Sequence, residues 1–301
     1  MTMLEEQGGS AQQAVSPELE RRAERRESWR GFFHAVPAYV YLIVFFVLPL
    51  FVVFVFSFAS RGRTGRPMLE GWNVDSWARL SEPLVRTVVL RSFWMAVLNT
   101  LLCLVIGYLF AYWIATRPKQ STRTLLLILV LIPFWSNFLV RTYAWRMLLD
   151  SDGYITQLGE LTGLWGRMLF TLPAVFIGLL YGYLPFMVLP LYAAIERIDW
   201  SLVEGGRDLY ATGRQAFLKI TLPLSRPGII AGSILVFIPS LGAYVTPDIL
   251  GGAKTTLLGN FIVTQFGAAR NWPFGSALSG AILFIMLLAT ILYFRSGART
   301  V

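Results

Sequence analysis

Charged side chains, histidine and cysteine are scarce in this sequence, and their scarcity excludes several classes of protein. Only 14% of the 301 residues are charged, whereas soluble domains carry about 25%. Cys103 is the single cysteine and His34 the single histidine, which leaves no thiolate metal site and no histidine-based catalysis. The chain also has no G-x-x-x-x-G-K-[ST] phosphate-binding sequence. We therefore expect no catalytic residue, no metal site and no cofactor in this chain.

Hydrophobic residues make up 55% of the chain and gather in long runs. A helix needs about 20 apolar residues to cross a bilayer, and six runs reach that length, although the second and fifth are interrupted. The sequence therefore predicts an all-α polytopic membrane protein with six transmembrane helices, at about 37–58, 92–115, 125–148, 171–195, 227–247 and 276–294.

The positive residues indicate the orientation of these spans, because cytoplasmic loops of membrane proteins are rich in Lys and Arg. With the N-terminus inside, fifteen Lys and Arg fall on the inner side and nine on the outer side. The net charge of +9 is then mainly a topology signal, and nucleic acid is not an expected partner. We predict cytoplasmic tails at 1–36 and 295–301, around a membrane domain at 37–294 whose loop 196–226 is also cytoplasmic.

Proline lies inside three of the predicted spans, at places that an inert anchor would avoid. Proline removes a backbone donor and frees the carbonyl four residues earlier, and in lipid that carbonyl needs a partner in protein or in a water-filled cavity. Broken helices near the bilayer midplane are typical of transport pathways, although packing kinks give the same pattern. We favour a pathway, with helix breaks at Pro133, Pro185, Pro190, Pro239, Gly242 and Pro247.

Few polar side chains accompany these breaks. The spans contain no Asp or Glu, which argues against a proton-coupled carrier working alone. Aromatic faces attract ammonium groups, so tyrosines beside the breaks suggest a cationic substrate, whereas packing is their ordinary role. The candidates for a substrate path are Asn99, Trp135, Asn137, Tyr181, Tyr183, Tyr244 and Asp248. Asp248 has an alternative role as a loop or cap acid, and Arg141 is either a packing or a pathway residue.

A polar stretch of about twenty residues, EGGRDLYATGRQAFLKITLP at 204–223, separates the fourth and fifth runs. Ser201 and Glu204 fit a capping box, so we expect a helix from Ser201 that stops at Gly213 in a left-handed conformation. A second short helix should follow at 215–220 and end at Leu222-Pro223. The first helix is short and contains two glycines, so it is marginal in water and needs to dock, on its own bundle or on a partner.

The spacing of this stretch resembles the EAA loop of ABC-importer permeases, E-A-A-x3-G-x9-I-x-L-P. Glycine replaces both alanines, and Tyr210 replaces the motif glycine. In that family the loop is a coupling helix that binds an ATPase subunit. The resemblance leaves open whether the chain turns at Tyr210 or later, at Gly213. It implies an ATPase-coupling set of Ser201, Glu204, Gly205, Gly206, Arg207, Asp208, Tyr210, Gly213, Ile220, Leu222 and Pro223.

Four further stretches resemble the permeases of spermidine/putrescine importers: PFWSNFLVRTYAW (133–145), YLPFMVLPLYAAIERID (183–199), PSLGAYVTPDILGGAKTTLLGN (239–260) and NWPFGSAL (271–278). Those permeases often have an acid at the position of Ala243. The resemblance implies the transmembrane fold of type I ABC importers, in the lipid of the bacterial inner membrane, and a polyamine substrate. It also implies a second homologous permease subunit, two ATPase subunits that bind ATP and Mg, and an extracytoplasmic binding protein.

The residues by themselves leave a different class of transporter open. A stand-alone secondary carrier or channel for an organic cation would use the same broken helices without a partner ATPase. A membrane enzyme is poorly supported, because the spans lack acids, histidine and a nucleophile–base pair.

Overall fold

The computed structural model describes residues 35–62, 65, 67–69, 71–252 and 255–297, and these residues are predominantly helical. The chain divides into two compact units, Met1–Val55 and Phe56–Val301. Ala35–Phe56 is an apolar helix of 22 residues, which includes the π-helical turn η1 (Ile43–Val47) and α2 (Leu48–Phe56), and none of the residues in η1 and α2 is buried. Most of the predicted tails, at 1–34 and 298–301, lies outside the described residues.

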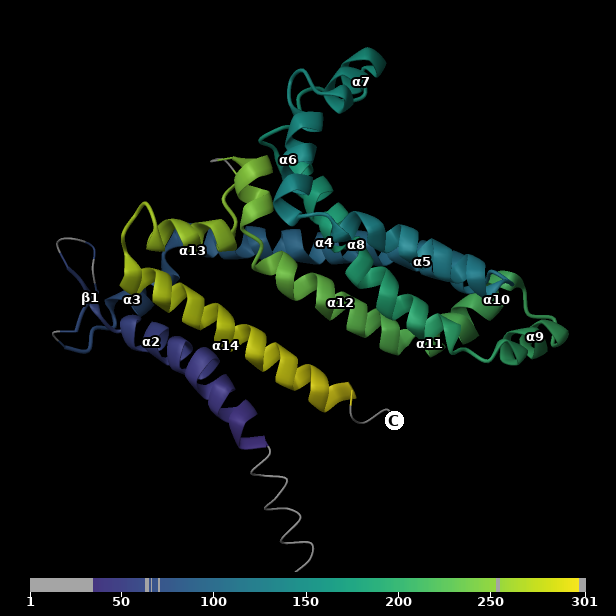
Figure 1. The fold of residues 1–301 in the computed structure, drawn as a ribbon, viewed down its shortest axis with the longest axis horizontal. Helices are drawn as coiled ribbons and strands as arrows, with labels where there is room; N and C mark the ends of the chain where they lie inside the picture. The colour runs from purple at the N-terminus through teal and green to yellow at the C-terminus, as the bar shows by residue number, and fades with distance from the viewer. Residues whose placement is uncertain (1–34, 63–64, 66, 70, 253–254, 298–301) are drawn as a thin grey trace, which may run out of the picture. The chain divides into compact units, whose positions relative to one another are not determined.

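Three long helices form the core of the second unit: α4 (Pro83–Ala115), α8 (Leu172–Glu196) and α12 (Arg226–Leu241), which lie side by side in Figure 1. Small residues allow helix backbones to approach closely in membranes. Gly107 of α4 and Gly232 of α12 both face Met187 of α8, and a Cβ at these glycines would lie 2.9 and 2.7 Å from its side chain. One methionine between two glycine surfaces therefore joins the three helices.

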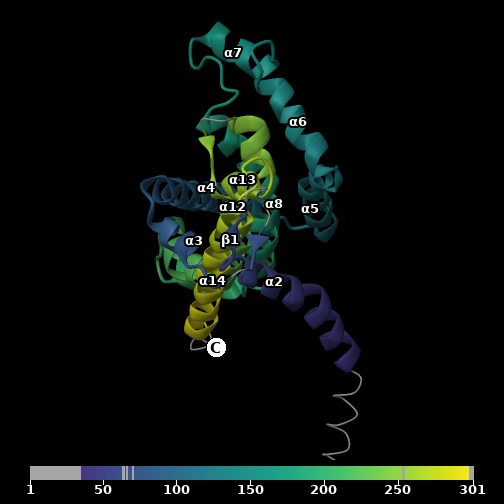
Figure 2. The same ribbon diagram turned by 90° about the vertical axis from the view of Figure 1, so that its left-hand side faces the viewer.

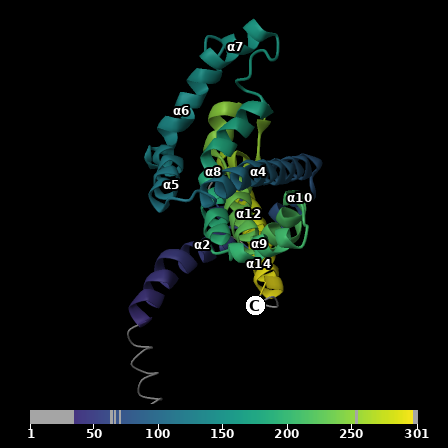
Figure 3. The ribbon, with the colours of Figure 1, turned by 90° about the vertical axis from the view of Figure 1, so that its right-hand side faces the viewer.

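The third predicted span is broken into two helices. α5 (Gln120–Trp135) and α6 (Phe138–Leu149) belong to segments that are bent by 86°. The bend follows Pro133, whose carbonyl accepts a hydrogen bond from Ser136 Oγ at 2.7 Å. Asn137 then starts the new helix, because its side chain accepts from the Leu139 amide at 2.8 Å. α6 and α7 (Tyr154–Thr162) project away from the three core helices (Figures 2 and 3).

The polar stretch between α8 and α12 folds into two short helical segments. The first is α9 (Trp200–Asp208). The second joins α10 (Gly213–Ala216), η3 (Phe217–Thr221) and α11 (Leu222–Leu224), and it meets α12 at an angle of 64°. Figure 1 shows both segments at one end of α12, where α11 contacts it.

The remaining elements are short, apart from the last helix. After α2 come a two-stranded antiparallel sheet of β1 (Ser60–Arg61) and β2 (Pro67–Met68), α3 (Asp75–Ala78) and η2 (Arg79–Ser81). After α12 come η4 (Pro247–Gly251), α13 (Leu258–Phe266) and α14 (Trp272–Gly297). Ser92 of α4 fixes the start of α13, because its buried hydroxyl accepts from the Leu258 amide at 2.7 Å.

The predicted all-α class is confirmed, whereas the predicted number of six spans is not. Among the described residues, three helices are long and apolar enough to cross a bilayer, at Ala35–Phe56, Pro83–Ala115 and Leu172–Glu196. The number rises to five if each of the two bent pairs is one span. The sixth run lies in α14 (Trp272–Gly297), within which the apolar helix Trp272–Leu288 is shorter than these three.

The structure corrects several predicted interruptions. α4 is continuous over 33 residues, so the interruption in the second hydrophobic run does not break the helix. α8 continues through Pro185 and Pro190, because transmembrane helices tolerate proline where neighbouring helices hold them and α8 packs on both α4 and α12. α12 ends at Leu241, with Gly242 as its C-cap, two residues after Pro239. Pro247 begins η4 instead of ending a span.

Candidate coupling unit and substrate path

The residues between α8 and α12 form a folded element, 199–224, that we call the coupling unit. Its first helix is capped by Asp199, whose carboxylate accepts from the Ser201 amide at 3.0 Å. The predicted capping box of Ser201 and Glu204 is therefore wrong, since an aspartate two residues earlier caps the helix instead. Hydrogen bonds from the Ser201 hydroxyl and amide hold the pKa of the Asp199 carboxyl below its usual value. The carboxylate form of the cap therefore prevails at neutral pH, and the stability that its charge adds is lost as the pH falls through that lowered pKa.

The chain turns at Tyr210, the position of the motif glycine. Tyr210 has φ 61°, its amide donates to the Arg207 carbonyl at 2.9 Å, and the Ala211 amide donates to the Gly206 carbonyl at 3.1 Å. This pair of bonds is a Schellman motif, which usually has glycine at the left-handed position. A side chain in this conformation costs about 1–2 kcal/mol. The turn nevertheless stays at Tyr210, although tyrosine replaces the motif glycine there.

Gly213 does not stop the first helix, contrary to the prediction from the sequence. It is the first residue of α10, and Thr212 is the N-cap. Thr212 Oγ1 accepts from the Gln215 amide at 3.3 Å, and Gln215 Oε1 accepts from the Thr212 amide at 2.9 Å. This capping box leaves Gly213 inside a helix. The predicted stop at Leu222-Pro223 is also wrong, because the segment continues to Leu224.

One face of the coupling unit packs on its own bundle. The Phe217 ring makes edge contacts with Tyr108 and Tyr112 of α4, at centroid distances of 5.5 and 5.7 Å, and Trp200 lies 6.2 Å from Tyr112. Within the unit, a Cβ at Gly206 would lie 2.7 Å from Ile220, so the two ends of the motif contact each other. These contacts satisfy the need of a short helix for tertiary support.

The opposite face of the coupling unit is open. A Cβ added at Gly205 would have no atom within 4 Å, so this glycine, unlike Gly206, is not required by packing in this chain. The side chains of Leu209 and Tyr210 are 83% and 96% exposed. The remaining exposed residues of the predicted coupling set on this part of the unit are Ser201, Glu204, Arg207 and Asp208.

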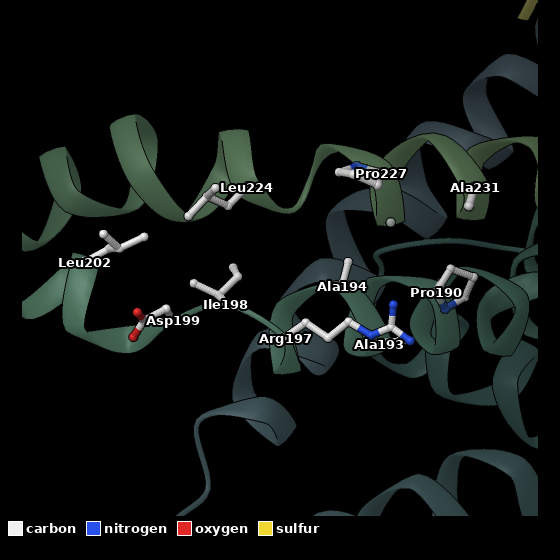
Figure 4. A pocket seen from close by; sticks show the side chains of 11 residues that line it. Pro190, Ala193, Ala194, Arg197, Ile198, Asp199, Leu202, Leu224, Pro227 and Ala231 are labelled. Carbon is white, nitrogen blue, oxygen red and sulfur yellow. The ribbon is translucent and has the colours of Figure 1, made fainter. Parts of the chain in front are cut away.

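A groove beside the coupling unit was not predicted from the sequence. It has a volume of about 490 Å³ and lies between α8 and α12, with Asp199 and Leu202 at one end (Figure 4). Small side chains make up much of its wall, but no pattern in the sequence marks them as a groove. The lining residues are Pro190, Ala193, Ala194, Arg197, Ile198, Asp199, Leu202, Leu224, Pro227, Gly228 and Ala231.

An ion pair ties α5 to the end of α8, directly before the coupling unit. The Glu196 carboxylate accepts from the Tyr192 hydroxyl at 2.7 Å and lies 3.9 Å from Arg123 Nη1. Arg123 Nε also donates to the Arg117 carbonyl at 2.6 Å. The pair is partly exposed, so its contribution to stability is small.

The candidates for the substrate path fall into separate local groups. Asn99 is fully buried and donates to Ser240 Oγ at 2.8 Å, and Tyr183 donates to the Pro239 carbonyl at 3.3 Å. Both therefore hold the end of α12, and the buried Asn99 Oδ1 has no hydrogen-bond partner among the described residues. Trp135, 80% exposed, and Asn137 lie at the α5–α6 bend.

Tyr181 belongs to α8 and makes an edge contact with Trp145 of α6 at 5.5 Å. Tyr244 and Asp248 are both exposed, and the Asp248 amide donates to the Tyr244 carbonyl at 2.9 Å. These two side chains are therefore one helical turn apart. Arg141 lies over the rings of Phe134 and Phe138, at 5.1 and 5.9 Å, which favours its packing role.

Residues 104–299 match the family described as binding-protein-dependent transport system inner membrane component. The chain belongs to this family. It is 41% identical over 260 residues to the spermidine/putrescine transport system permease protein PotB of Escherichia coli (strain K12), covering 85% of this chain and 94% of that protein. It is also 34% identical over 235 residues to the inner membrane ABC transporter permease protein YdcU of the same organism, covering 73% and 74%.

Two solved structures resemble this one at 16% sequence identity, which is evidence of a common fold only. One is a bacterial ABC transporter for import of the acidic polysaccharide alginate, with a TM-score of 0.68 over 92% of this chain and 99% of that chain. The other is the alginate transporter in complex with its pentasaccharide-bound periplasmic protein, with a TM-score of 0.71 over 91% and 96%.

These comparisons confirm the predicted ABC-importer permease fold and the resemblance to polyamine permeases. As a member of this family, the chain is an inner membrane permease component and not an enzyme. The residues of the EAA-like stretch lie within the matched range, and the structure adds the Schellman turn and the Asp199 cap, neither of which the motif itself specifies.

Proposed function

We propose that this chain is one of two homologous permease subunits of an ATP-driven importer for a polyamine of the spermidine or putrescine type. An extracytoplasmic binding protein delivers the substrate, and two ATPase subunits bind ATP and Mg, while this chain binds no cofactor. The observation that supports the proposal most is the 41% identity to the spermidine/putrescine permease over 85% of the chain. The excess of Lys and Arg in the inner segments supports cytoplasmic termini and a cytoplasmic coupling unit.

The coupling unit is well placed to transmit movement to the bundle. Only residues 197–199 connect α8 to α9, and Ser225 alone separates α11 from α12. Ser225 is buried and its hydroxyl lies 2.9 Å from the Tyr108 hydroxyl of α4. We infer that an ATPase subunit bound to the open face moves α4, α8 and α12 together, so that the substrate path opens alternately to each side.

The proposed outer end of the substrate path is the exposed pair of Tyr244 and Asp248. An aromatic ring and a carboxylate one turn apart suit an ammonium group, since the ring attracts the cation and the carboxylate accepts its hydrogen bonds. We extend the path from this pair to the end of α12, at Pro239 and Gly242, and to the exposed side chains Trp135, Asn137 and Tyr181.

Asp248→Asn is expected to weaken polyamine uptake, with an apparent affinity about tenfold lower. An exposed charge-assisted hydrogen bond contributes about 1.5 kcal/mol, which corresponds to roughly a tenfold change in affinity. The measurement is the concentration dependence of radiolabelled spermidine uptake by cells that carry the complete transporter. Asp152→Asn, at an exposed acid in another loop, is the matched control and should leave uptake unchanged. Unchanged affinity in Asp248→Asn would remove this residue from the path.

Reconstitution tests the proposed function as a whole. The chain, its partner permease and the ATPase subunits should co-purify and, in liposomes with the binding protein, should take up spermidine or putrescine only when ATP is present. Uptake that needs neither ATP nor an ATPase subunit would instead identify a secondary carrier or channel. ATP-dependent uptake of a different solute, with no polyamine binding by the cognate binding protein, would contradict the proposed polyamine substrate. The proposed role as a subunit of an ATP-driven importer would still stand.

A further inference from the structure

Tyr210 combines backbone strain with almost complete exposure. Its φ of 61° lies in the left-handed region, which glycine adopts freely and other residues avoid. At the same time its side chain is 96% exposed, so the ring obtains little packing from its own chain in return. Glycine at this position would form the same Schellman turn without the strain. The side chain is thus unfavourable for the isolated permease, which points to a favourable contact outside this chain.

The position of Tyr210 suggests that its contact outside the chain is a protein interface. It lies at the end of α9 next to Leu209, which is 83% exposed, and Figure 1 places α9 and α10 at one end of the core helices. Tyrosine is among the residues that contribute most to protein interfaces. The turn that carries it is held by two backbone hydrogen bonds, so little conformational freedom is lost on binding.

The charges around Tyr210 favour a protein partner over the membrane surface. The exposed charged side chains before and after Tyr210 are of both signs, with Glu204 and Asp208 acidic and Arg207 and Arg214 basic. A surface that binds anionic lipid instead concentrates Lys and Arg. Mixed charges around an apolar centre are typical of a protein interface, where they set orientation and choice of partner.

We propose that Tyr210 is an anchor of the interface with the ATPase subunit and inserts its ring into an apolar pocket of that subunit. This inference rests on the proposed coupling function. It also makes Tyr210 a specificity residue, because a permease with the usual motif glycine has no side chain to fill such a pocket. The backbone strain is then offset in the assembled transporter by the buried ring.

The test compares Tyr210→Gly, Tyr210→Ala and Tyr210→Phe in the assembled pair of permease subunits. Affinity for the ATPase subunit is measured by biolayer interferometry in detergent, and the melting temperature of the permease pair is measured in parallel. We expect Tyr210→Gly to raise the melting temperature and to weaken ATPase binding at least tenfold. Tyr210→Ala should weaken binding equally without the gain in stability, whereas Tyr210→Phe should stay within about threefold of the parent, because the buried ring supplies most of the contact.

Tyr154 provides the control, because it is also a highly exposed tyrosine, 80%, but belongs to α7. Tyr154→Ala should leave ATPase binding unchanged. Unchanged or tighter binding by Tyr210→Gly would overturn the proposal, and loss of binding only by Tyr154→Ala would also do so. If the parent protein itself binds no ATPase subunit, the proposed function fails, and the anchor fails with it.

A photo-crosslinking amino acid at position 210 gives a second, independent readout. Benzoylphenylalanine in place of Tyr210 should form an adduct with the ATPase subunit in membranes that contain the complete transporter. An adduct with lipid alone would assign Tyr210 to the membrane surface and overturn the proposal, while leaving the proposed importer function intact.

Discussion

Glu204→Lys is expected to weaken binding of the ATPase subunit by at least tenfold and to abolish ATP-driven uptake, while the permease still folds. Glu204 lies on the exposed surface of α9 and occupies the acidic position of the EAA-like motif. Truncating one member of a buried interfacial charge pair costs about 2–5 kcal/mol, and ~1.4 kcal/mol is already tenfold. Charge reversal should therefore be at least as severe as truncation.

The Asp199 cap makes this variant easier to interpret. If Glu204 were part of a capping box, as its sequence position suggests, its replacement would also weaken the helix itself. The cap is instead Asp199, and Glu204 is exposed, so the expected loss concerns the interface and not the fold.

The measurements are co-purification of the ATPase subunit and ATP hydrolysis stimulated by the loaded binding protein. Asp199→Asn is the control, because asparagine is an equally good N-cap and the substitution removes a charge at the start of the same helix. It should leave both measurements close to the parent values. Normal assembly together with normal stimulated hydrolysis in Glu204→Lys would refute docking through this face.

Gly228→Val is expected to prevent α8 and α12 from packing and to lower the yield of folded permease sharply. Gly228 is buried in α12, and a Cβ there would lie 2.6 Å from the Pro190 carbonyl oxygen and 2.5 Å from the Ala194 Cβ. Neither atom can move by a change of side-chain rotamer, since the Pro190 oxygen belongs to the backbone and the Ala194 Cβ is bonded directly to it. Overpacking of this kind costs about 1–3 kcal/mol for added methylene groups, and relief here requires a shift of a whole helix.

The measurement is the monodisperse fraction in detergent by size-exclusion chromatography, together with the melting temperature. Gly182→Ala is the matched control, because Gly182 lies in α8 with no atom within 4 Å of an added Cβ. It should match or exceed the parent, since alanine is the better helix former by about 1 kcal/mol. A Gly228→Val protein as stable as the parent would mean that α8 and α12 do not approach each other as described.

The hydrophobic runs predicted the helices well, because burial and span length depend mainly on local composition. They did not predict where the helices end. Pro133 precedes a bend because Asn137 can cap a new helix four residues later, and that signal is local. Pro185 and Pro190 leave α8 intact because α4 and α12 pack against it, and no property of the residues near these prolines reports such neighbours.

In the candidate site, too, features that depend on neighbouring residues can be predicted, whereas contacts with residues distant in the sequence cannot. Asn99 is predicted as a path residue because it is polar and lies in a span, and the sequence near it does not show its hydrogen bond to Ser240, 141 residues away. The sequence predicts the cap of α9 at Ser201, whereas the cap is Asp199. Both residue types are good caps, and the two positions are only two residues apart. The turn at Tyr210 follows from the Schellman hydrogen bonds, which prevail over the preference of tyrosine for negative φ.

Met187 has a mechanical consequence for the core. Interlocked branched side chains would hold three helices in one fixed register, whereas a thioether with three rotatable bonds adapts its shape. Gly107 and Gly232 present smooth backbone on either side of it. We therefore expect this contact to stay closed when the three helices move together and their relative angles change slightly.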